Sequence, residues 1–147
     1  MALGLLAPVP ERHLESAFKT PGPQGEVAFG SCAFETFKRL DDLLRGQTCD
    51  CLIYASHSVK PLSSPTVTWM ATYVRFVEAR NNGTHPNPEF RPLTTESDSQ
   101  WYVFWHVGGL KQLSREERIK ISTLHGYEKP KRYLTNFIPE GPVIIDW

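Results

Sequence analysis

The sequence predicts an α+β protein built as a small mixed β-barrel with helices packed at its ends. The expected element order, β-α-β-β-β-α-β, fits neither a doubly wound sheet nor a helix bundle. An uncharged aromatic run at 100–107 is typical of a strand buried on both faces, at the centre of a sheet. The stretch 66–78 alternates in polarity along the chain. The more polar of its two faces becomes more apolar along its length, as in a strand that curves around a barrel.

The N-terminal residues 1–25 are predicted to form an irregular arm. Prolines interrupt this stretch, and Pro21-Gly22-Pro23 follows its only helical pattern, a short helix at 11–19. The remaining residues, 26–147, then form a single barrel domain, which is an ordinary size for one hydrophobic core.

The first half of that domain contains a strand, a helix and a second strand. An apolar run at 26–31 predicts the first strand. Apolar residues at helical spacing predict a helix over 33–45, and Gly46 supplies its C-cap. The run at 51–56 predicts the next strand, and the proline- and serine-rich residues 57–65 predict an irregular loop.

The second half begins with the alternating strand at 66–78. Residues 79–99 hold Asn81-Asn82-Gly83 and several prolines, which predicts a long surface loop. After the aromatic strand, Ser114 and Glu117 form a capping-box pattern that predicts a short helix to about residue 124. Residues 133–138 are expected to be extended, and 143–147 to form a terminal strand.

Composition and charge narrow the class of function. Lys plus Arg and Asp plus Glu each number 16, so no global field attracts the chain to nucleic acid or an anionic membrane. The odd count of 3 cysteines favours a reducing compartment, which predicts a cytoplasmic or nuclear protein that is not secreted. No apolar run reaches the ~18 residues of a membrane span, so no membrane partner is expected.

Metal binding and catalysis find little support in the sequence. Cys49-x-Cys51 with His57 lacks the spacing and the second ligand pair of a zinc site, so neither a metal nor another cofactor is expected. Ser56 and His57 are neighbours, and adjacent side chains of a strand point to opposite faces. The sequence contains no nucleophile elbow and no phosphate-binding glycine loop, so a binding protein is favoured over an enzyme.

Binding of a flat aromatic ligand fits the pattern better, because such ligands are held by stacking and a few hydrogen bonds. The candidate stacking surfaces are Trp69, Trp101 and Trp105. Two small polar residues at strand ends, Ser31 and Ser56, could supply hydrogen bonds. A basic cluster could contact phosphates and consists of Lys111, Lys129, Lys131 and Arg132. The alternatives are core tryptophans, strand-end caps and a solvated basic turn.

Three stretches of the chain resemble PUA-like domains, most nearly the EVE and YTH branch. In the first stretch, an apolar strand (VAFGS) leads to a helix that ends in glycine. In the second, Gly46 opens a polar turn before a strand that contains Tyr54 and Ser56. In the third, the run WYVFWHV precedes Leu110 and Leu113. The resemblance implies a non-catalytic module that takes a modified base of DNA or RNA into an aromatic cage. It assigns polar contacts to Ser31, Tyr54 and Ser56 and stacking to Trp69, Trp101 or Trp105.

The aromatic strand itself yields a sharper expectation. Alternation puts Trp101, Val103, Trp105 and Val107 on one face, and that face is expected to line the pocket, with His106 packed behind it as a hydrogen-bonded core histidine. Two other functions remain open. One is a protein-interaction module, an inhibitor or adaptor, that uses the proline-rich arm or the 79–99 loop; the other is a small hydrolase or nuclease that uses His57, His106 or His125.

Overall fold

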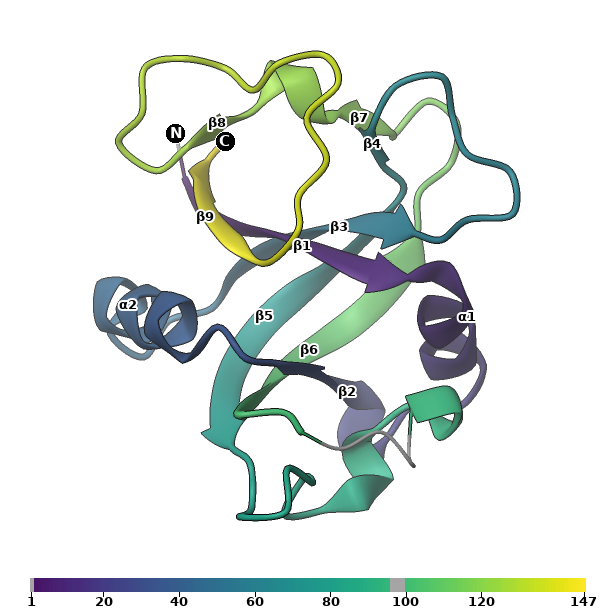
Figure 1. Cartoon of the computed structure of the whole chain (residues 1–147), viewed down its shortest axis with the longest axis vertical. Helices are drawn as coiled ribbons and strands as arrows, with labels where there is room; N and C mark the ends of the chain where they lie inside the picture. The colour runs from purple at the N-terminus through teal and green to yellow at the C-terminus, as the bar shows by residue number, and fades with distance from the viewer. Residues whose placement is uncertain (1, 96–99) are drawn as a thin grey trace.

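The structure is a computed structural model that describes residues 2–95 and 100–147 (Figure 1). It is a small mixed α+β fold, mostly sheet, as the sequence predicts. One sheet has the strand order β2-β6-β5-β3-β1-β9-β8, and β4 pairs with β7 in a second, smaller one. The elements are β1 (Leu3–Pro10), α1 (Glu11–Lys19), β2 (Glu26–Ser31), α2 (Phe34–Leu44), β3 (Cys49–Ser56), β4 (Thr66–Val67), β5 (Trp69–Glu78), β6 (Val103–Gln112), β7 (Ile119–Lys120), β8 (His125–Gly126) and β9 (Val143–Asp146).

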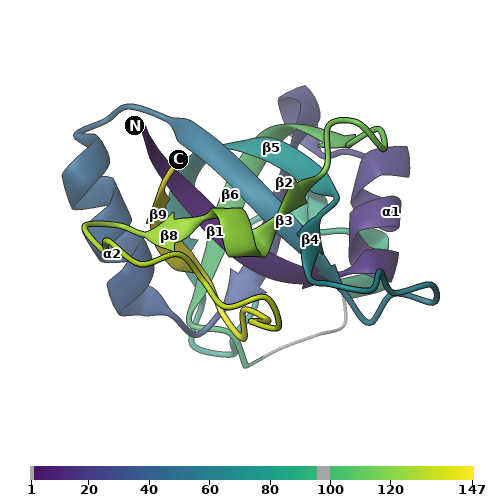
Figure 2. The ribbon, with the colours of Figure 1, turned by 90° about the horizontal axis from the view of Figure 1, so that it is seen from above.

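The seven-stranded sheet is strongly curved, but it is not closed into a barrel. Strands β2 and β8 are its two edges, and no ladder joins them, so the predicted barrel is not confirmed. The curvature nevertheless brings β2 round to face β1, although these are the first and fifth strands of the order (Figure 1). The helices α1 and α2 lie at opposite sides of this curved sheet (Figure 2).

The interpretation of residues 1–25 as an irregular arm is wrong. Strand β1 lies inside the sheet, parallel to β3 and antiparallel to β9, and α1 follows it at the predicted residues 11–19. Leu5, Ala7 and Val9 of β1 are buried in the main core. Pro8 and Pro10 therefore belong to a strand, although proline has no N–H group to donate to a neighbouring strand.

The backbone groups of β1 point in directions that accommodate both prolines. Ala2 exchanges both backbone hydrogen bonds with Trp147, so the even-numbered residues of β1 point their N–H groups toward the β9 side. The pairing with β9 covers only Leu3 to Leu6. Pro8 and Pro10 point the same way but lie beyond the last pair, where no strand needs a donor. Both prolines are therefore tolerated in an interior strand.

Strand β6 is buried on both faces over residues 103–107, as predicted, but it is not the centre of the sheet. It lies second from the β2 edge, between β2 and β5, and β3 is the central strand. The predicted alternation is confirmed, since Val103, Trp105 and Val107 share the main core. Trp101 and Tyr102 precede the strand, and Tyr102 is mostly exposed.

The helix expected at 33–45 is confirmed as α2, and Arg45 and Gly46 after it both adopt positive φ. Phe37, Leu40 and Leu44 turn the buried face of α2 onto the main core. The strand expected at 51–56 is confirmed and begins two residues earlier. The strand expected at 66–78 is divided at Thr68, whose N–H donates to the Ile53 carbonyl and whose carbonyl accepts from Leu113.

The helix predicted to start at Ser114 does not form. Half of the capping box is present, because the Ser114 N–H donates to Glu117 Oε1 at 3.1 Å. The chain then makes a turn and pairs Ile119–Lys120 with Thr66–Val67 as β7. Residues after it bury Ile121 and Leu124 in a second core on the other face of the sheet, and this tertiary packing prevails over the local capping signal.

The predicted surface loop at 79–99 is only partly a surface loop. Residues 96–99 lie outside the described part, but within 79–95 three polar side chains are buried: His85, Arg91 and Thr95. The segment folds back against the sheet and contains two short 3₁₀ turns, Pro88–Phe90 and Leu93–Thr95. The terminal strand at 143–147 is confirmed as β9, while 133–138 contains no strand.

Candidate ligand site

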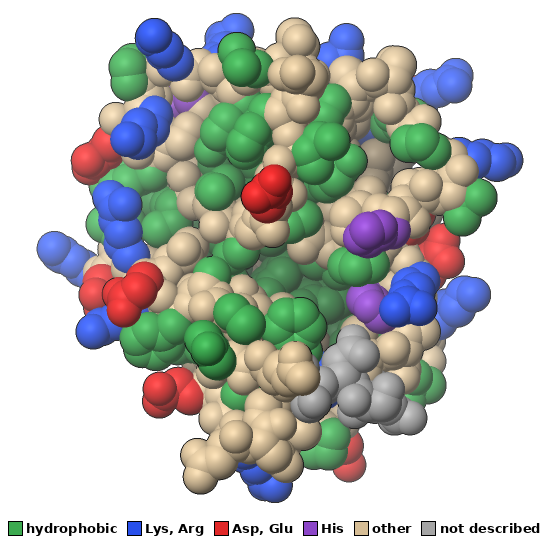
Figure 3. Space-filling view, in the orientation of Figure 1, with side chains coloured by type: hydrophobic (Ala, Val, Ile, Leu, Met, Phe, Trp, Pro, Cys, Tyr) green, Lys and Arg blue, Asp and Glu red, His purple; other side chains and the backbone are tan. Residues whose placement is uncertain are grey.

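The gap between β1 and β2 contains a cavity of about 640 Å³, which we name the aromatic pocket. It opens where β9 ends and the edge of β1 is left uncovered. The space-filling view shows a hollow lined mainly by hydrophobic side chains in this region (Figure 3). The residues that line it are Ala7, Pro8, Val9, Pro10, His13, Phe29, Gly30, Ser31, Cys32, Ala33, Arg91, Thr95, Trp101, Trp105, Glu140, Gly141 and Pro142.

The floor of the aromatic pocket is a fixed aromatic cluster. The Trp105 and Phe29 rings lie 5.1 Å apart and tilted by 47°, and Phe37 stacks on Trp105 from α2 with its ring centroid at 5.9 Å. Trp105 is only 3% exposed, so most of its surface belongs to the core. Such clusters bury large apolar areas and hold their rings rigidly.

Trp101 forms a side wall, and its position depends on Gly30. A Cβ atom on Gly30 would lie 2.5 Å from the Trp101 ring, so the indole rests directly on the β2 backbone. A backbone hydrogen bond from Tyr102 to Ser31 fixes the adjoining residue at 3.1 Å. Trp101 is half-buried, and within the described residues its indole N–H has no hydrogen-bond partner.

Ser31 ends β2 at the pocket. Its hydroxyl oxygen accepts a hydrogen bond from the Ala33 N–H at 3.0 Å, just before α2 begins. The side chain is therefore both a local cap, which was one of the two readings of this serine, and a lining group of the cavity. Its hydroxyl hydrogen is still available to donate to a ligand, since a hydroxyl both donates and accepts.

The remaining polar groups come from the rim. His13 of α1 lines the pocket, and its Nδ1 lies 2.7 Å from Thr94 Oγ1. The Arg91 guanidinium lies over the Phe104 ring at 5.0 Å, with its side chain almost wholly buried. Glu140 also lines the pocket, next to Gly141 and Pro142. None of His13, Arg91 and Glu140 was singled out from the sequence.

Of the six residues assigned to base contacts, the structure brings three together in the aromatic pocket: Ser31, Trp101 and Trp105. Trp69 is fully in the core, edge-on to Phe18 at 5.9 Å, and does not line the pocket. Tyr54 lines a different cavity, and Ser56 lines neither. The structure therefore does not bring Trp69, Tyr54 and Ser56 to the aromatic pocket.

The cavity that contains Tyr54 has about 690 Å³, and we name it the polar groove. It lies at the end of β3 and is walled mainly by the two loops 57–65 and 135–138. Polar side chains dominate it, among them Glu11, His57, Lys60, Gln112, Arg118 and Asn136.

The basic residues assigned to phosphate contacts are also divided. Lys129 and Lys131 line a surface depression with Arg39, Tyr127 and Tyr133, which we name the basic groove. Pro142 lines both this groove and the aromatic pocket, so the two adjoin. Arg132 is exposed but does not line the groove, and Lys111 lies on β6, 3.5 Å from the Glu117 carboxylate.

The histidines considered for catalysis lie in three different places. His57 is exposed beside the polar groove, His125 is half-buried in β8, and His106 is fully buried in β6. The expectation that His106 is a hydrogen-bonded core histidine is confirmed, because it bonds to His85 and Glu26. Over the described residues, no group of three or more His, Cys, Asp or Glu is arranged to hold a metal ion.

The cysteines form no disulfide: Cys49 and Cys51 are buried side by side in the main core, and Cys32 is exposed at the pocket. Burial raises the pKa of Cys49 to about 12, so this thiol stays protonated at neutral pH. No described helix is long and apolar enough to cross a membrane.

Comparison with known proteins adds no relative. The chain matches no model of a protein family, and a search of curated proteins finds no similar sequence.

Proposed function

We propose that this protein binds a modified nucleobase of DNA or RNA in the aromatic pocket, without catalysing a reaction. The observation that carries the proposal is the meeting of Trp101, Trp105 and Ser31 around one cavity. Its volume of about 640 Å³ is in the range of small-ligand sites, which span roughly 300–1,000 Å³. Aromatic walls with few polar groups suit a flat, uncharged heteroaromatic ring.

The two kinds of wall have different tasks in this proposal. Trp101, half-buried on the Gly30 backbone, is the surface on which a base stacks, and stacking contributes roughly 1–3 kcal/mol per base. Trp105 and Phe29 close the far end and limit the size of the substituent that enters. The Ser31 hydroxyl supplies a hydrogen bond, so a base with an acceptor at its edge is favoured.

A base within a polynucleotide is proposed in preference to a free base. The basic groove adjoins the aromatic pocket at Pro142, and Arg39, Lys129 and Lys131 line it together with Tyr127 and Tyr133. Phosphates on one side of a base held in the pocket would reach these cations, which is how a chain of zero net charge can bind nucleic acid locally. A PUA-like module of the EVE or YTH kind, which three stretches of the sequence resemble, would act in this way.

The interaction-module alternative has less support. It would use the proline-rich arm or the 79–99 loop, but β1 is an interior strand and the described part of the loop packs on the sheet. The hydrolase alternative would use His57, His106 or His125, and none of these lines the aromatic pocket. Among the described residues that line the aromatic pocket, the one carboxylate is Glu140 and the one histidine is His13, which is engaged with Thr94.

The test is a titration of tryptophan fluorescence with short single-stranded DNA and RNA oligonucleotides. Each would contain one N6-methyladenine, 5-methylcytosine or 5-hydroxymethylcytosine, and would be compared with the unmodified strand. We expect saturable quenching by at least one modified strand, at least tenfold tighter than by its unmodified partner.

Trp101→Ala should abolish this binding while the protein stays folded, because the ring is only half-buried. Tyr102→Ala is the matched control, since it removes the neighbouring aromatic ring, which is exposed and does not line the pocket. Equal binding by Trp101→Ala and the unsubstituted protein, or no binding by any strand, would refute the proposal.

A further inference from the structure

A chain of hydrogen bonds runs through the buried space on the other face of β6 from the aromatic pocket. The backbone N–H of Asn87 donates to His85 Nδ1 at 2.7 Å, and His85 Nε2 lies 2.9 Å from His106 Nε2. His106 Nδ1 lies 3.0 Å from Glu26 Oε1, and the same oxygen accepts from Arg75 at 2.6 Å. We name this chain, from Asn87 to Glu26, the imidazole relay.

The position of every proton in the imidazole relay follows from its two ends. A backbone N–H can only donate, so His85 Nδ1 is the acceptor and the proton of the neutral ring is on Nε2. That N–H donates to His106 Nε2, which leaves the second proton on His106 Nδ1. This N–H donates to the Glu26 carboxylate. Every bond is satisfied only when both rings are neutral, each in one tautomer.

Adding a proton to either ring breaks a bond of the relay. A proton on His85 Nδ1 would face the Asn87 N–H, and a proton on His106 Nε2 would face the His85 N–H. The surrounding charges also oppose a cation, since Arg75 of β5 and Arg80 and Arg91 of the 79–95 segment lie nearby. Among the described residues, one carboxylate, Glu26 of β2, bonds to an imidazole of the relay.

Burial lowers the pKa of each imidazole from 6.5 to about 4. For His85, the charges of His106 and the three arginines also lower the pKa. For His106, burial is again the largest cause and Arg75 adds to it. Both rings are therefore neutral at pH 7.

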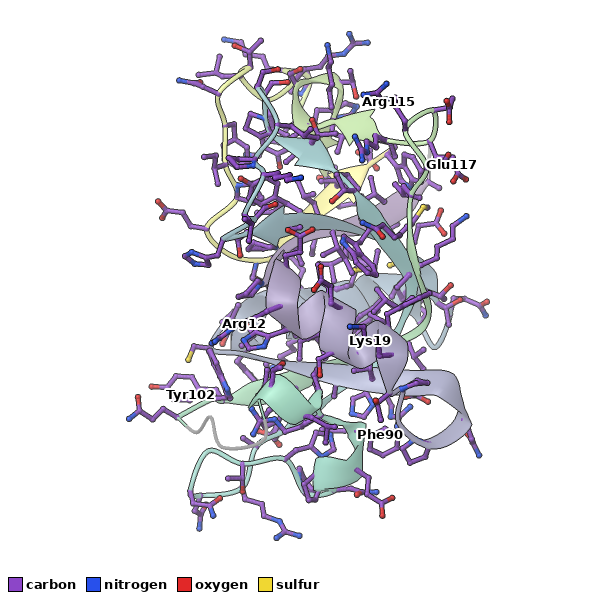
Figure 4. The ribbon with its side chains drawn as sticks, turned by 90° about the vertical axis from the view of Figure 1, so that its right-hand side faces the viewer. Arg12, Lys19, Phe90, Tyr102, Arg115 and Glu117 are labelled. Carbon is purple, nitrogen blue, oxygen red and sulfur yellow. The ribbon has the colours of Figure 1, made fainter. Side chains whose placement is uncertain are left out.

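The imidazole relay fastens the segment that forms one wall of the aromatic pocket. The Phe90 ring packs against both imidazoles, with its centroid 5.7 Å from His85 and 4.8 Å from His106. Figure 4 places Phe90 beneath the end of α1 that carries Lys19. The next residue, Arg91, lines the pocket and so does Thr95, while Thr94 bonds to His13. His85 and His106 thus hold this wall through Phe90 and Arg91.

We propose that the imidazole relay is a positioning device for the aromatic pocket, which keeps the 79–95 segment in place only while both imidazoles are neutral. Acidification then releases one wall and lowers ligand affinity, so ligand binding is coupled to pH. This regulation rests on the proposed function of the pocket, whereas the acid-induced release of the segment stands apart from it. His85 and His106 are positioning residues, since neither lines the cavity.

Hydrogen exchange measured between pH 7.0 and 4.5, with intrinsic rates corrected, tests the release directly. The amides of Asn87, Phe90, Arg91 and Thr95 all donate within the segment. We expect their protection to fall by at least about tenfold more than that of the β5–β6 ladder, because the released state takes up protons that the closed state excludes. Parallel loss in segment and ladder, or unchanged protection, would overturn the proposal.

The double variant His85→Gln/His106→Gln removes both titrating rings and should reduce this pH effect to less than threefold. His57→Asn is the matched control: it removes an exposed histidine at positive φ, which asparagine tolerates, and should leave the tenfold effect unchanged. If the double variant does not fold, the imidazole nitrogen signals of the unsubstituted protein decide. They should show a proton on His85 Nε2 and on His106 Nδ1 at pH 7; the reverse tautomers, or titration near pH 6.5, would overturn the proposal.

A binding experiment separates this inference from the proposed function. The modified oligonucleotides of the fluorescence titration should bind at least tenfold more weakly at pH 4.5 than at pH 7.0, and the double variant should lose less than threefold. A modified strand that binds equally at both pH values would overturn the regulation while the proposed function stands. If no oligonucleotide binds at either pH, both the proposed function and the coupling of binding to pH fail. The hydrogen-exchange experiment then decides by itself whether acid releases the 79–95 segment.

Discussion

The aromatic pocket and the polar groove are cavities of similar size in one small protein, but they are built in opposite ways. Strands β1, β2 and β6 supply part of the lining of the aromatic pocket, and its floor, Trp105 and Phe29, belongs to the main core. The polar groove is walled mainly by the loops 57–65 and 135–138 and lined by polar side chains. A rigid apolar frame with few polar groups fits recognition of one flat ligand, whereas solvated loops do not impose such a shape.

The difference also separates residues that look alike in sequence. Ser31 and Ser56 both end apolar strands, but β2 ends at the aromatic pocket and β3 ends beside the polar groove. Three antiparallel pairings lead from β2 through β6 and β5 to β3, so β2 and β3 run in opposite directions and end at opposite ends of the sheet. The following predictions test whether the aromatic pocket is the functional cavity of the two, from the largest expected effect to the smallest.

Trp105→Ala should destabilise the protein by about 3–5 kcal/mol, because it empties a site in the main core between Phe29 and Phe37. Urea denaturation measures the loss of unfolding free energy. Trp101→Ala serves as the comparison and should lose much less, since its ring is half-buried on the pocket wall. Equal losses in the two variants would show that both rings are core, and Trp101 would then not be a separate binding surface.

Lowering the pH from 6.5 to 4 should reduce the free energy of unfolding by on the order of 3 kcal/mol through His85 and His106. The pKa of each ring is about 4 in the folded protein and 6.5 in the unfolded chain, so the unfolded chain binds more protons in this window. Below about pH 4 both states are protonated and these rings cause no further loss. Denaturation at pH 7.0 and 4.5 measures this loss of unfolding free energy. The double variant His85→Gln/His106→Gln should lose less than half as much as the unsubstituted protein. An equal loss in the two proteins would contradict the account.

Gly30→Ala should cost about 1–3 kcal/mol, because the added methyl group meets the Trp101 ring at 2.5 Å and displaces it. Ligand affinity should fall at least tenfold with it. Gly141→Ala is the matched control, since it lines the same pocket and its methyl group would meet no atom within 4 Å. If both variants bind equally well, the position of Trp101 on β2 does not matter for binding.

Tyr54→Phe and Ser56→Ala should change neither ligand affinity nor stability by more than about 0.5 kcal/mol, because each removes only a hydroxyl group from a partly exposed side chain. Tyr54 belongs to the polar groove, and neither residue lines the aromatic pocket. A tenfold loss of binding in either variant would place the ligand in the polar groove instead.

Much of the fold could be predicted, because local periodicity determines it. The α2 helix, strands β2, β3 and β9, the buried faces of β6 and the role of His106 in the core all follow from apolar spacing and caps. Strand β1 could not be recognised, because Pro8 and Pro10 are compatible with a strand only where β9 has already ended. The helix after Ser114 was predicted from a real capping contact, but pairing with β4 decides the conformation of that segment.

The candidate site could be predicted only in part, for a related reason. Ser31, Trp101 and Trp105 belong to paired neighbours, β2 and β6 with the residues before it, so alternation along one strand pair is enough to bring them together. His13, Arg91 and Glu140 come from a helix and two irregular segments, whose meeting at the pocket depends on the curvature of the whole sheet. No local pattern carries that information, although the single arginine among the prolines of 86–92 distinguishes Arg91 in the sequence.

The most direct test of the central claim is to map backbone and indole chemical shifts while a modified single-stranded oligonucleotide is added. The account predicts the largest shifts at the Trp101 indole N–H and at the amides of Gly30, Ser31 and Ala33, with smaller shifts at Lys129 and Lys131. Shifts concentrated instead around Tyr54, His57 and Arg118 would contradict it, because they would place the ligand in the polar groove.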